Sequence, residues 1–577
     1  MNVLYPIPLK KQFIAKDYKF QVIDLEARNW TDFIVGGYYD GKEYFQYRNL
    51  DEITNYINES KKPLKIFAHY GGAYDFLFLL ENFFKNKIDV QSITMRGSLI
   101  LSVKIKGLYK YHVLRDSIAL LPFSLKTLTN NFNVETKKGD YDHSLNRGYN
   151  EELAEYLKSD CLGLHQVLNK FFNSELVRKA GRATTIASQA QKILQTYLKE
   201  PVFSPNDEMN EYMREACHGG RTEIFKPLGS KIYEYDVNSL YPTVMKAYEY
   251  PSGRAMNTTK FHKNKFGIYT VKVKCPEIHI PIIPIKTDKK LLFPKGEFTT
   301  TITSVEIEYA KTLGYKFKIL KGVIFTKKER YFQDFISELY AMRQKAEKNT
   351  VDNVLTKLIM NSSYGKFIIK KDKSNLVLNN QEGCSFYKEL KVGSETIELF
   401  EKPVTLNSFN HCGIGAFILA YARIHMHKLM HPIAEHVYYT DTDSIWTDIK
   451  LPSSNELGDL KLELPKNKSN KEYYDKVCFL LPKTYIAESD EFKKVAMKGF
   501  DRRKITKLTF NEFNLALLGE LKLSVDHDEV VSKFKTAIKN NKILTKKPKF
   551  TKNINSKYDK RIINLKTNRS EPIRLQP

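Results

Sequence analysis

Two aspartates that are one residue apart, Asp441 and Asp443, offer the clearest chemistry in this sequence. An apolar and aromatic run over 436–439 precedes them and Ile445 and Trp446 follow, a pattern that predicts strand, tight turn and strand. Side chains alternate faces along an extended chain, so both carboxylates would point the same way and reach one divalent cation. A third carboxylate would complete a two-metal centre, whose ions lie roughly 3.5–4 Å apart and stabilise an in-line phosphoryl transfer. An Asp-rich turn without metal is the alternative.

Asp236 is the candidate for the third carboxylate. The segment over 231–242 predicts a strand that delivers Asp236, then a turn, then a helix that begins near Pro242, where proline suits a first helical turn. The backbone oxygen of Val237 could be a further metal ligand. Tyr241 could pack against a sugar and exclude a 2′-hydroxyl by crowding, with simple core packing as the alternative.

A helix predicted from Val351 to Phe367 carries a cation, an amide and an aromatic ring on one face. These residues are spaced at i, i+4 and i+7: Lys357, Asn361 and Tyr364. Charge suits a phosphate and a ring suits a base or sugar, so this face is a candidate nucleotide site. A second helix predicted over 331–349 adds Arg343 and Lys345, which could help to neutralise a triphosphate. A solvated helix face is the alternative.

Four acidic residues in the first part of the chain offer a second metal site: Asp24, Glu26, Asp75 and Asp160. The first two end a strand predicted over 20–26, where side-chain alternation puts them on one side. The third would begin a helix that follows a strand over 64–68; a helix cap is its alternative role. The fourth lies in a helix predicted over 151–172, four residues after Tyr156 and on the same face. Four carboxylates could hold two ions, and the tyrosine could orient a water.

The composition indicates a polyanionic partner. The chain has 577 residues, with 92 Lys and Arg against 66 Asp and Glu and a formal charge of +26. Such an excess favours nucleic acid; a cationic protein with no such partner is the alternative. A chain of this length needs several domains. Six widely spaced cysteines, none in a Cys-x-x-Cys pair, suit a reducing compartment. Because no apolar run is long enough to span a bilayer, we expect no membrane partner.

The acidic set of the first part resembles the DEDD-type 3′-5′ proofreading exonuclease domain of DNA polymerases, in its Tyr-x-x-x-Asp form. The resemblance implies that all four carboxylates bind metal and that Tyr156 orients the attacking water. One departure concerns the second motif, which usually carries Asn near the place of Tyr70. That Asn holds the single-stranded primer end in the family, so proofreading strength is left open here.

Two shorter segments resemble DNA-contacting motifs of the same enzymes. Ser117, with Ile118 in a Leu position, resembles a Ser-Leu-x-x-hydrophobic motif that binds single-stranded DNA and the terminal protein. Gly219 and Gly220, with Cys217 in place of Tyr, resemble the Tyr-x-Gly-Gly motif that couples the exonuclease and polymerase sites. Adjacent glycines let a backbone approach a phosphate closely. A buried strand-loop is the alternative for the first segment and a plain glycine turn for the second.

Three segments look like motifs A, B and C of family B DNA polymerases, in the expected order: 236–242, 357–365 and 439–444. In that family the second aspartate of motif C is the more direct metal ligand, which suggests Asp443 over Asp441. Lys483 and Tyr485 are similar to the family's Lys-x-Tyr motif, which contacts the primer strand. The resemblance extends over most of the chain.

The layout is similar to the protein-primed branch, the polymerases of small tailed phages and linear plasmids. The resemblance implies an α/β multidomain fold, with an RNase H-like exonuclease domain and a right-hand polymerase that carries two terminal-protein-region insertions. The expected ranges are an exonuclease domain over 1–190, palm over 191–259 and 411–510, a first insertion over 260–328, fingers over 329–371, a second insertion over 372–410 and thumb over 511–577. In the family the first insertion docks the terminal protein, and the second closes a tunnel around the template.

The resemblance therefore implies a DNA-directed DNA polymerase with 3′-5′ exonuclease proofreading and intrinsic strand displacement. It implies two Mg²⁺ ions per active site, with Mn²⁺ able to substitute. The implied partners are a DNA template-primer, dNTPs and a separate terminal protein that primes synthesis on a linear genome. We expect a monomer in the host cytoplasm of a phage infection, with the mitochondrion of a plasmid host as the alternative.

Other function classes explain parts of this pattern. A polymerase primed by nucleic acid instead of protein shares all the motifs. A DEDD nuclease with an inactive polymerase module needs the first acidic set but not the Lys-Asn-Tyr face. A reverse transcriptase or RNA replicase uses a paired-Asp hairpin without the first acidic set. A non-catalytic nucleic-acid-binding protein explains the charge but not every carboxylate.

Overall fold

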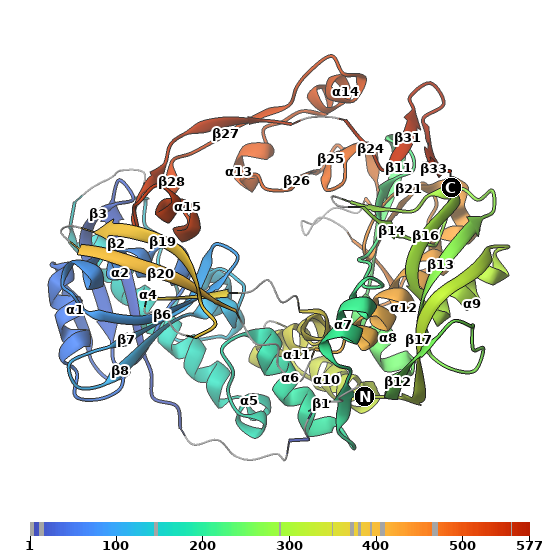
Figure 1. The fold of residues 1–577 in the computed structure, drawn as a ribbon. Helices are drawn as coiled ribbons and strands as arrows, with labels where there is room; N and C mark the ends of the chain where they lie inside the picture. Colours follow the sequence, from blue (N-terminus) through green and yellow to red (C-terminus); the bar gives the residue numbers. More distant parts are fainter. Residues whose placement is uncertain are drawn as a thin grey trace.

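The computed structural model shows a chain whose elements are arranged as a ring (Figure 1). It describes residues 5–7, 9–10, 17–143, 148–287, 290–348, 350–369, 374–378, 382–392, 395–403, 410–463, 471–554 and 557–576. No helix within these ranges is long and apolar enough to cross a membrane. The six cysteines all lie within them and are free thiols.

The first domain is built on a mixed sheet whose centre is parallel. The central strands, each parallel to the next, are β2 (Gln21–Arg28), β5 (Lys65–Ala68) and β8 (Tyr111–Asp116). The flanking strands are β3 (Asp32–Tyr39), β4 (Tyr44–Tyr47), β6 (Asp89–Arg96) and β7 (Leu99–Lys106). Alternation along β2 sends Val22 into a core with α4 (Glu151–Asn173). It sends Ile23 and Leu25 into a second core with α1 (Leu50–Glu59) and α2 (Asp75–Lys85), so helices cover both faces.

Two of the three motif segments, 236–242 and 439–444, begin on strands of a second sheet, here called the palm-like sheet. Its order is β10-β21-β22-β11-β24-β25-β26, β23 also pairs with β11, and these pairings are antiparallel. Its strands are β10 (Thr222–Ile224), β11 (Leu228–Val237), β21 (Val437–Asp441), β22 (Ser444–Thr447), β23 (Leu460–Leu462), β24 (Tyr474–Leu481), β25 (Thr484–Glu488) and β26 (Lys493–Met497). Two helices, α8 (Leu240–Ala247) and α12 (Cys412–Met430), contact each other and share a core with β11.

The two basic helices pair as α10 (Gln333–Lys345) and α11 (Val351–Ser362). The continuous helix expected to Phe367 is wrong in one respect: the α-helix ends at Ser362, and a 3₁₀ helix covers Tyr364–Ile368. The physical reason is local, because Gly365 has a low helix propensity and the preceding serines compete for backbone hydrogen bonds. Tyr364 therefore follows the helix that carries Lys357.

A third sheet runs β12-β17-β13-β16-β33 and covers much of the range expected for the first insertion. Its elements are β12 (Tyr250–Thr258), β13 (Gly267–Cys275), β16 (Lys295–Thr303), α9 (Ser304–Thr312), β17 (Lys316–Glu329) and β33 (Arg574–Leu575). In the range expected for the second insertion, β18 (Ser374–Val377), β19 (Ser385–Val392) and β20 (Glu395–Pro403) extend the first domain's sheet through β6. The first domain's sheet therefore has ten strands among the described residues.

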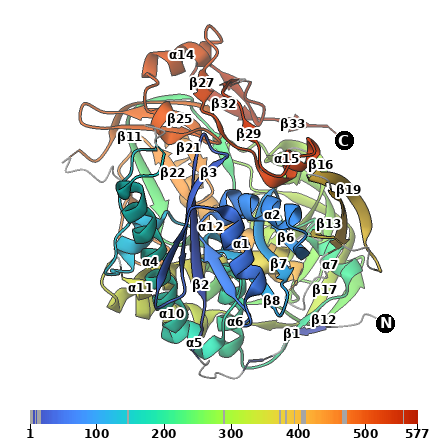
Figure 2. The ribbon, with the colours of Figure 1, turned by 90° about the vertical axis from the view of Figure 1, so that its left-hand side faces the viewer.

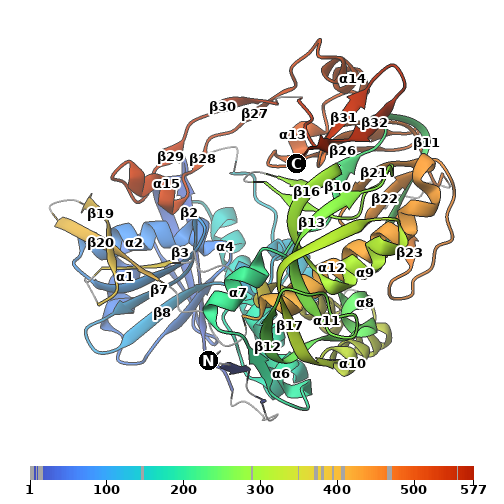
Figure 3. The ribbon, with the colours of Figure 1, turned by 45° about the vertical axis from the view of Figure 1, so that its right-hand side comes forward.

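The last part of the chain crosses between the two sides of the ring (Figures 1 and 3). It leaves the palm-like sheet through α13 (Arg502–Ile505), α14 (Phe510–Leu518) and β27 (Ser524–His527). Then α15 (Phe534–Lys539) buries Phe534 and Ile538 in the first domain's second core, beside Leu390 of β19. The chain returns through β30 (Phe550–Asn553) to the hairpin of β31 (Arg561–Asn564) and β32 (Arg569–Pro572), which β33 follows. Figure 2 shows α15 above α2 and beside β19.

The expected linker near 198–210 is only partly a linker. Strand β9 (Val202–Ser204) pairs antiparallel with β1 (Tyr5–Ile7), and α7 (Asp207–Arg214) follows directly. Before it, α5 (Glu175–Ala180) and α6 (Ile186–Tyr197) pack against each other and continue the core around α4. The first domain and the palm-like sheet are therefore joined by packed helices.

Candidate active sites

The four acidic residues of the first set lie near enough for the charges of neighbouring members to act on the pKa values of Asp24 and Glu26. Strand β2 carries Asp24 and Glu26, and the backbone N–H of Leu25 between them donates to Asp75 Oδ1 at 2.8 Å. That bond fixes the first residue of α2 against β2. Asp160 comes from α4, which packs across β2, and Tyr156 lies one turn earlier with its hydroxyl beside the Asp160 carboxylate.

Lys138 is a member of this site that the sequence analysis did not identify. Its ammonium donates to the Tyr156 hydroxyl at 2.6 Å, forms an ion pair with Asp160, and lies 4.4 Å from the centre of the Tyr156 ring. It comes from a connection between α3 (Leu125–Asn131) and α4, where no periodic pattern marks it. The available signal was weak: two lysines followed by glycine and aspartate.

The pKa values of the four carboxyl groups in this set are all raised. Burial, and then the charges of Asp160 and Asp75, raise the pKa of Glu26 to about 8. Burial raises the pKa of Asp75 to about 7, and burial with the neighbouring acids raises the pKa of Asp24 well above its ordinary value. Burial also raises the pKa of Asp160, although Lys138 opposes the shift. Repulsion of this kind is what a bound cation would relieve.

The donor chemistry of this set fits a divalent cation. Carboxylate oxygens are the ligands that hard cations prefer, and the buried Oδ1 of Asp160 has no hydrogen-bond partner among the described residues. The side chains do not yet converge, since no three His, Cys, Asp or Glu side chains in the described part of the chain meet closely enough to hold an ion. Lys138 lies against Asp160 in this arrangement, so its ammonium would have to move aside for a cation at that carboxylate.

The raised pKa values predict an unusual pH dependence of stability. The folded protein keeps a proton on Glu26 up to about pH 8, whereas the unfolded chain loses it near 4.5. Folding therefore takes up protons between these values, and the free energy of unfolding must fall as pH rises through that window. In EDTA we expect the melting temperature to fall between pH 5 and pH 8, more gently in Glu26→Gln. Thermal melts across pH would test this; an equal slope in both proteins would contradict it.

Ser117 does not reach the surface, which corrects the expected direct contact with DNA. Its side chain is buried, its hydroxyl donates to the Ala68 carbonyl at 3.0 Å, and it lies 2.9 Å from Nδ1 of His69. The structure therefore agrees with the alternative given for this segment, a buried loop after a strand. The neighbouring Tyr70, which stands where Asn is usual, has a side chain 48% exposed and a left-handed backbone with φ of 63°. A single strand would therefore meet Tyr70 before it met Ser117.

The second site is centred on the predicted hairpin, which is confirmed as β21 and β22. The turn is tighter than an extended chain, because Thr442 has a φ of 64°. Strand alternation, from which we expected both carboxylates to point the same way, therefore does not hold at this turn, and their binding of one ion stays a prediction. Asp441 accepts from Lys483 Nζ at 2.7 Å through both oxygens and from Thr222 Oγ1 at 3.1 Å. Asp443 instead faces the strand that carries Asp236.

Strand β11 brings Asp236 to the hairpin. Asp236 stands opposite Ser444 in the ladder, and the Val237 N–H donates to the Asp443 carbonyl at 2.8 Å. Burial, and then the charge of Asp443, raise the pKa of Asp236 to about 7. Burial also raises the pKa of Asp443. Two desolvated carboxylates that repel each other provide the donor set of a cation site, with Asp441 next to it but paired with Lys483.

Some of the residues proposed to bind the nucleotide lie near Asp236 and Asp443, and others are exposed away from them. Burial, and then Arg343, lower the pKa of Lys357, whose ammonium also feels Asp236. The rings of Tyr241 and Tyr364 stack with centroids 4.3 Å apart, close to Asp443. Two residues are on the periphery: Asn361 and Lys345 are exposed, and Lys345 is the last residue of α10. The structure thus brings two basic side chains, Lys357 and Arg343, and two stacked tyrosine rings near Asp236 and Asp443.

The strand that follows the hairpin adds two charges that sequence reasoning did not assign. Lys461 stands opposite Asp236 in the ladder between β11 and β23, and Glu463 also acts on the pKa of Asp236. Of the Lys-x-Tyr pair, Lys483 binds Asp441. Tyr485 is only 8% exposed and packs against Trp446. Tyr485 cannot contact DNA in this arrangement as expected, because its ring is buried in a hydrophobic core with Trp446.

Of the two glycines, Gly220 packs against the aspartate turn and Gly219 does not. A Cβ on Gly220 would lie 2.7 Å from the Thr442 side chain and 3.0 Å from its Cα, so only glycine allows this approach. Gly219 is exposed with open space around its Cα, which leaves a phosphate contact possible there. Cys217, in the usual Tyr position, is half-buried with its thiol beside the Cys412 carbonyl. The segment is therefore packed against the aspartate turn.

Comparison with known proteins agrees with this geometry. The family of DNA polymerases type B, organellar and viral, matches residues 54–152 and 143–435. A probable DNA polymerase of Ascobolus immersus is 26% identical over 556 residues, covering 80% of this chain and 45% of that protein. The DNA-directed DNA polymerase of Enterobacteria phage PRD1 is 27% identical over 486 residues, covering 80% of this chain and 81% of that protein. The chain spans about half the length of the first curated relatives that it matches.

Solved structures show the same fold. A ternary complex of Phi29 DNA polymerase with primer-template DNA and incoming nucleotide superposes with a TM-score of 0.73 at 21% identity. The likeness covers 93% of this chain and 100% of that chain. The multidomain α/β fold expected from the motifs, an exonuclease domain with a right-hand polymerase, is therefore confirmed. Because the family match extends over more than half of the residues, the chain belongs to the type B DNA polymerases of the organellar and viral family.

Proposed function

We propose that this protein is a DNA-directed DNA polymerase that also proofreads with a 3′-5′ exonuclease. The observation that supports it best is the presence of two separate carboxylate sites. One joins Asp236 and Asp443 on the palm-like sheet, and the other surrounds Asp24 and Asp160 in the first domain. A nuclease alone would need only the second, and an RNA replicase only the first.

For nucleotidyl transfer, the chain's own groups bind and orient the substrates. Lys357 and Arg343 face the triphosphate, and the stacked Tyr241 and Tyr364 form the wall against which the sugar and base rest. Asp236, Asp443 and the backbone oxygen of Val237 are the proposed ligands of two Mg²⁺ ions, which Mn²⁺ could replace. When bound, the ions lower the pKa of the attacking hydroxyl and neutralise the triphosphate. Lys483 holds Asp441 beside this pair.

For proofreading, the four carboxylates of the first domain are the proposed metal ligands and Tyr156 orients the attacking water. Lys138, which donates to the Tyr156 hydroxyl and pairs with Asp160, would hold the tyrosine in place and occupy one lone pair of its oxygen, so that its O–H acts as a hydrogen-bond donor. Burial raises the pKa of Tyr156 beyond its ordinary value, so the phenol stays protonated and does not itself act as a base.

We further propose that synthesis starts on a protein primer. A hydroxyl of a separate terminal protein would take the place of the primer 3′-hydroxyl, and a monomer would copy a linear genome in a phage-infected cytoplasm or a mitochondrion. The proposed division of labour follows the expected ranges, with β13, β16 and β17 in the docking insertion and β18–β20 in the processivity insertion. Support comes from α15, which packs beside β19 in the first domain's core and so completes the ring.

Primer extension on a singly primed single-stranded circle, with Mg²⁺, dNTPs and no accessory protein, tests this proposal. We expect products many times the length of the circle, because the closed ring would keep the template bound while the strand ahead is displaced. Products that stop at one circle length would keep the polymerase and reject intrinsic strand displacement. Degradation of the primer without extension would reject the polymerase and keep the exonuclease.

A further inference from the structure

The aspartate turn is held from one side by a short edge strand. Strand β10 pairs with β21 so that Thr222 stands opposite Asp441, and the Thr222 hydroxyl donates to that carboxylate at 3.1 Å. One residue earlier, the Arg221 carbonyl accepts from the N–H of Thr442 at 2.7 Å. Thr442 is the residue between the two aspartates. The position of β10 therefore sets the position of the turn.

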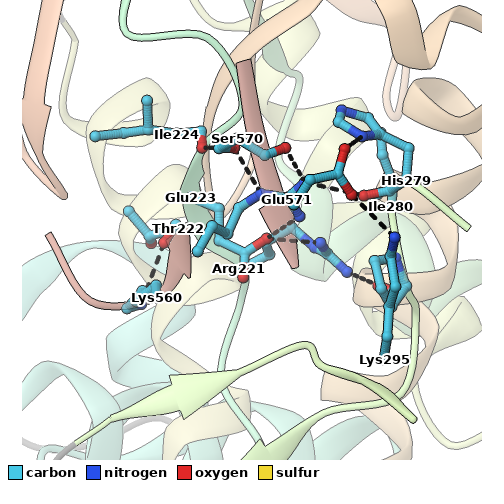
Figure 4. Close-up of polar contacts among 12 residues, drawn as sticks. Arg221, Thr222, Glu223, Ile224, His279, Ile280, Lys295, Lys560, Ser570 and Glu571 are labelled. Atoms are coloured by element: carbon cyan, nitrogen blue, oxygen red, sulfur yellow. Dashed lines mark hydrogen bonds and ion pairs between the residues drawn. The ribbon is translucent and has the colours of Figure 1, made fainter. Parts of the chain in front are cut away.

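Strand β10 is itself held by three buried charged residues, Arg221, Glu223 and Arg561. Figure 4 shows the surroundings of the first two. The Glu223 carboxylate is fully buried and accepts from Arg221 Nη1 at 2.8 Å, with Arg561 Nη1 3.5 Å from the same oxygen. Arg561 belongs to the distant hairpin β31–β32. It donates to Ser570 Oγ at 2.8 Å and to the carbonyls of Ser570 and His279 at 3.0 and 3.1 Å. One guanidinium thus joins β10, β32 and the segment before β16.

The same hairpin region occupies the outer edge of β10. The Tyr558 hydroxyl accepts from the Ile224 N–H at 3.1 Å, and the Ser570 hydroxyl donates to the Ile224 carbonyl at 2.7 Å. Lys560 Nζ donates to the Thr222 carbonyl at 3.1 Å, and its charge also acts on Asp441. An edge strand otherwise presents unpaired backbone groups to solvent. Here groups from residues more than three hundred positions later satisfy them.

We infer that hairpin β31–β32 is a positioning element of the polymerase site, and that Arg561 and Lys560 are the positioning residues through which it holds Asp441 and Asp443 in place. The contact path runs from Arg561 through Glu223 and Arg221 to the backbone of the aspartate turn. Neither basic residue is placed among the groups that bind nucleotide or metal. The inference rests on the proposed polymerase function, since it names what sets the geometry of that site.

Because Arg221, Glu223 and Arg561 are buried, the network tolerates little change in their relative positions. A charge removed from water is tolerated only when it is paired and hydrogen-bonded, and Glu223 is shared by two guanidinium groups that are themselves buried. Each guanidinium also has an aromatic ring below it: Phe293 for Arg221 at 3.8 Å and Phe225 for Arg561 at 4.7 Å. A shift of the hairpin would unpair these charges, so β10 has one favoured position.

Single-nucleotide incorporation by Arg561→Ala, Arg561→Lys and Lys560→Met tests the inference in the full-length chain. Since a misplacement of about 1 Å can cost on the order of 10²-fold in rate, we expect kcat of Arg561→Ala to fall by about 10- to 100-fold. KM for dNTP should stay near the wild-type value, because Lys357 and Tyr241 are not touched. Arg561→Lys should recover part of the rate, and exonuclease activity on single-stranded DNA should be unchanged in all three.

The matched control is Arg569→Ala, which removes an exposed arginine of the same hairpin that pairs with Glu435. Its kcat should stay within about twofold of wild type, as for other surface changes. A second readout is independent of activity: backbone hydrogen exchange over 437–447 should speed up in Arg561→Ala but not in Arg569→Ala. Unchanged kcat and unchanged exchange in Arg561→Ala would overturn the inference.

Lys560→Met decides the matter if Arg561→Ala fails to fold, because it leaves the buried ion pairs in place. We expect it to lower kcat by about tenfold, in line with a smaller displacement of the turn. A kcat within about twofold of wild type would overturn the inference. If the wild-type protein itself did not extend a primer, the proposed function would fail separately, and the exchange rates would still test the role of the hairpin.

Discussion

Replacing Asp443 with alanine should abolish nucleotide incorporation while leaving exonuclease activity intact. Asp443 is the hairpin carboxylate that faces Asp236: burial and then the charge of Asp443 raise the pKa of Asp236, and burial raises the pKa of Asp443 itself. Removing one leaves a single buried carboxylate that cannot hold two cations. Loss of a central catalytic group commonly costs on the order of 10³-fold or more in rate. Primer extension and degradation of single-stranded DNA, measured on the same preparation, would show the separation.

The control for Asp443 is Asp448→Ala. Asp448 follows the same hairpin but pairs with His436 at 2.7 Å, away from the proposed ligands. It should keep most of its extension rate. Asp441→Ala is expected to be impaired less than Asp443→Ala, because Asp441 is already paired with Lys483. If Asp443→Ala extended a primer at the wild-type rate, the palm-like sheet would not be the site of synthesis.

The double change Asp24→Ala with Asp160→Ala should do the reverse and remove proofreading alone. These residues come from β2 and α4, and the charge of Asp160 is one of those that raise the pKa of Asp24. Without them Glu26 and Asp75 cannot hold two cations, so exonuclease activity should fall on the order of 10³-fold or more. Extension of a matched primer should continue, and mismatched primers should be extended without prior removal of the mismatch.

Asp140→Ala is the matched control for the exonuclease variant. Its carboxylate lies in the same connection as Lys138 but is exposed and pairs with Lys126 at 2.9 Å. It should degrade single-stranded DNA at close to the wild-type rate. Should the double variant and Asp443→Ala each lose both activities while remaining folded, the model of two separate sites would have to be abandoned.

Several features of the sites could be predicted because they depend on local rules. Alternation along a strand placed Asp24 and Glu26 together, and helical spacing placed Tyr156 beside Asp160. The hairpin of Asp441 and Asp443 followed from two apolar runs with a polar bend between them. The stacked pair of Tyr241 and Tyr364 was expected only as two separate nucleotide contacts.

Other features could not be predicted from these local rules. The rules assume an extended backbone or an exposed side chain, and at these positions the chain turns or the side chain is buried. Thr442 adopts a left-handed backbone, so the two aspartates of the hairpin contact different partners. Ser117 and Tyr485 lie in segments that resemble DNA-contacting motifs, yet both side chains are buried. Exposure depends on which elements pack over a residue, and no local pattern contains that information.

By itself the sequence determined the types of the catalytic groups, their order along the chain and the family to which they belong. Tertiary structure alone decided that Lys138 lies against Asp160, that Lys483 binds Asp441, and that Arg561 reaches Glu223 across more than three hundred residues. The physical reason is the range of the forces involved. Strand and helix periodicity act over a few residues, whereas buried charges find their partners wherever folding brings opposite charges together and excludes water.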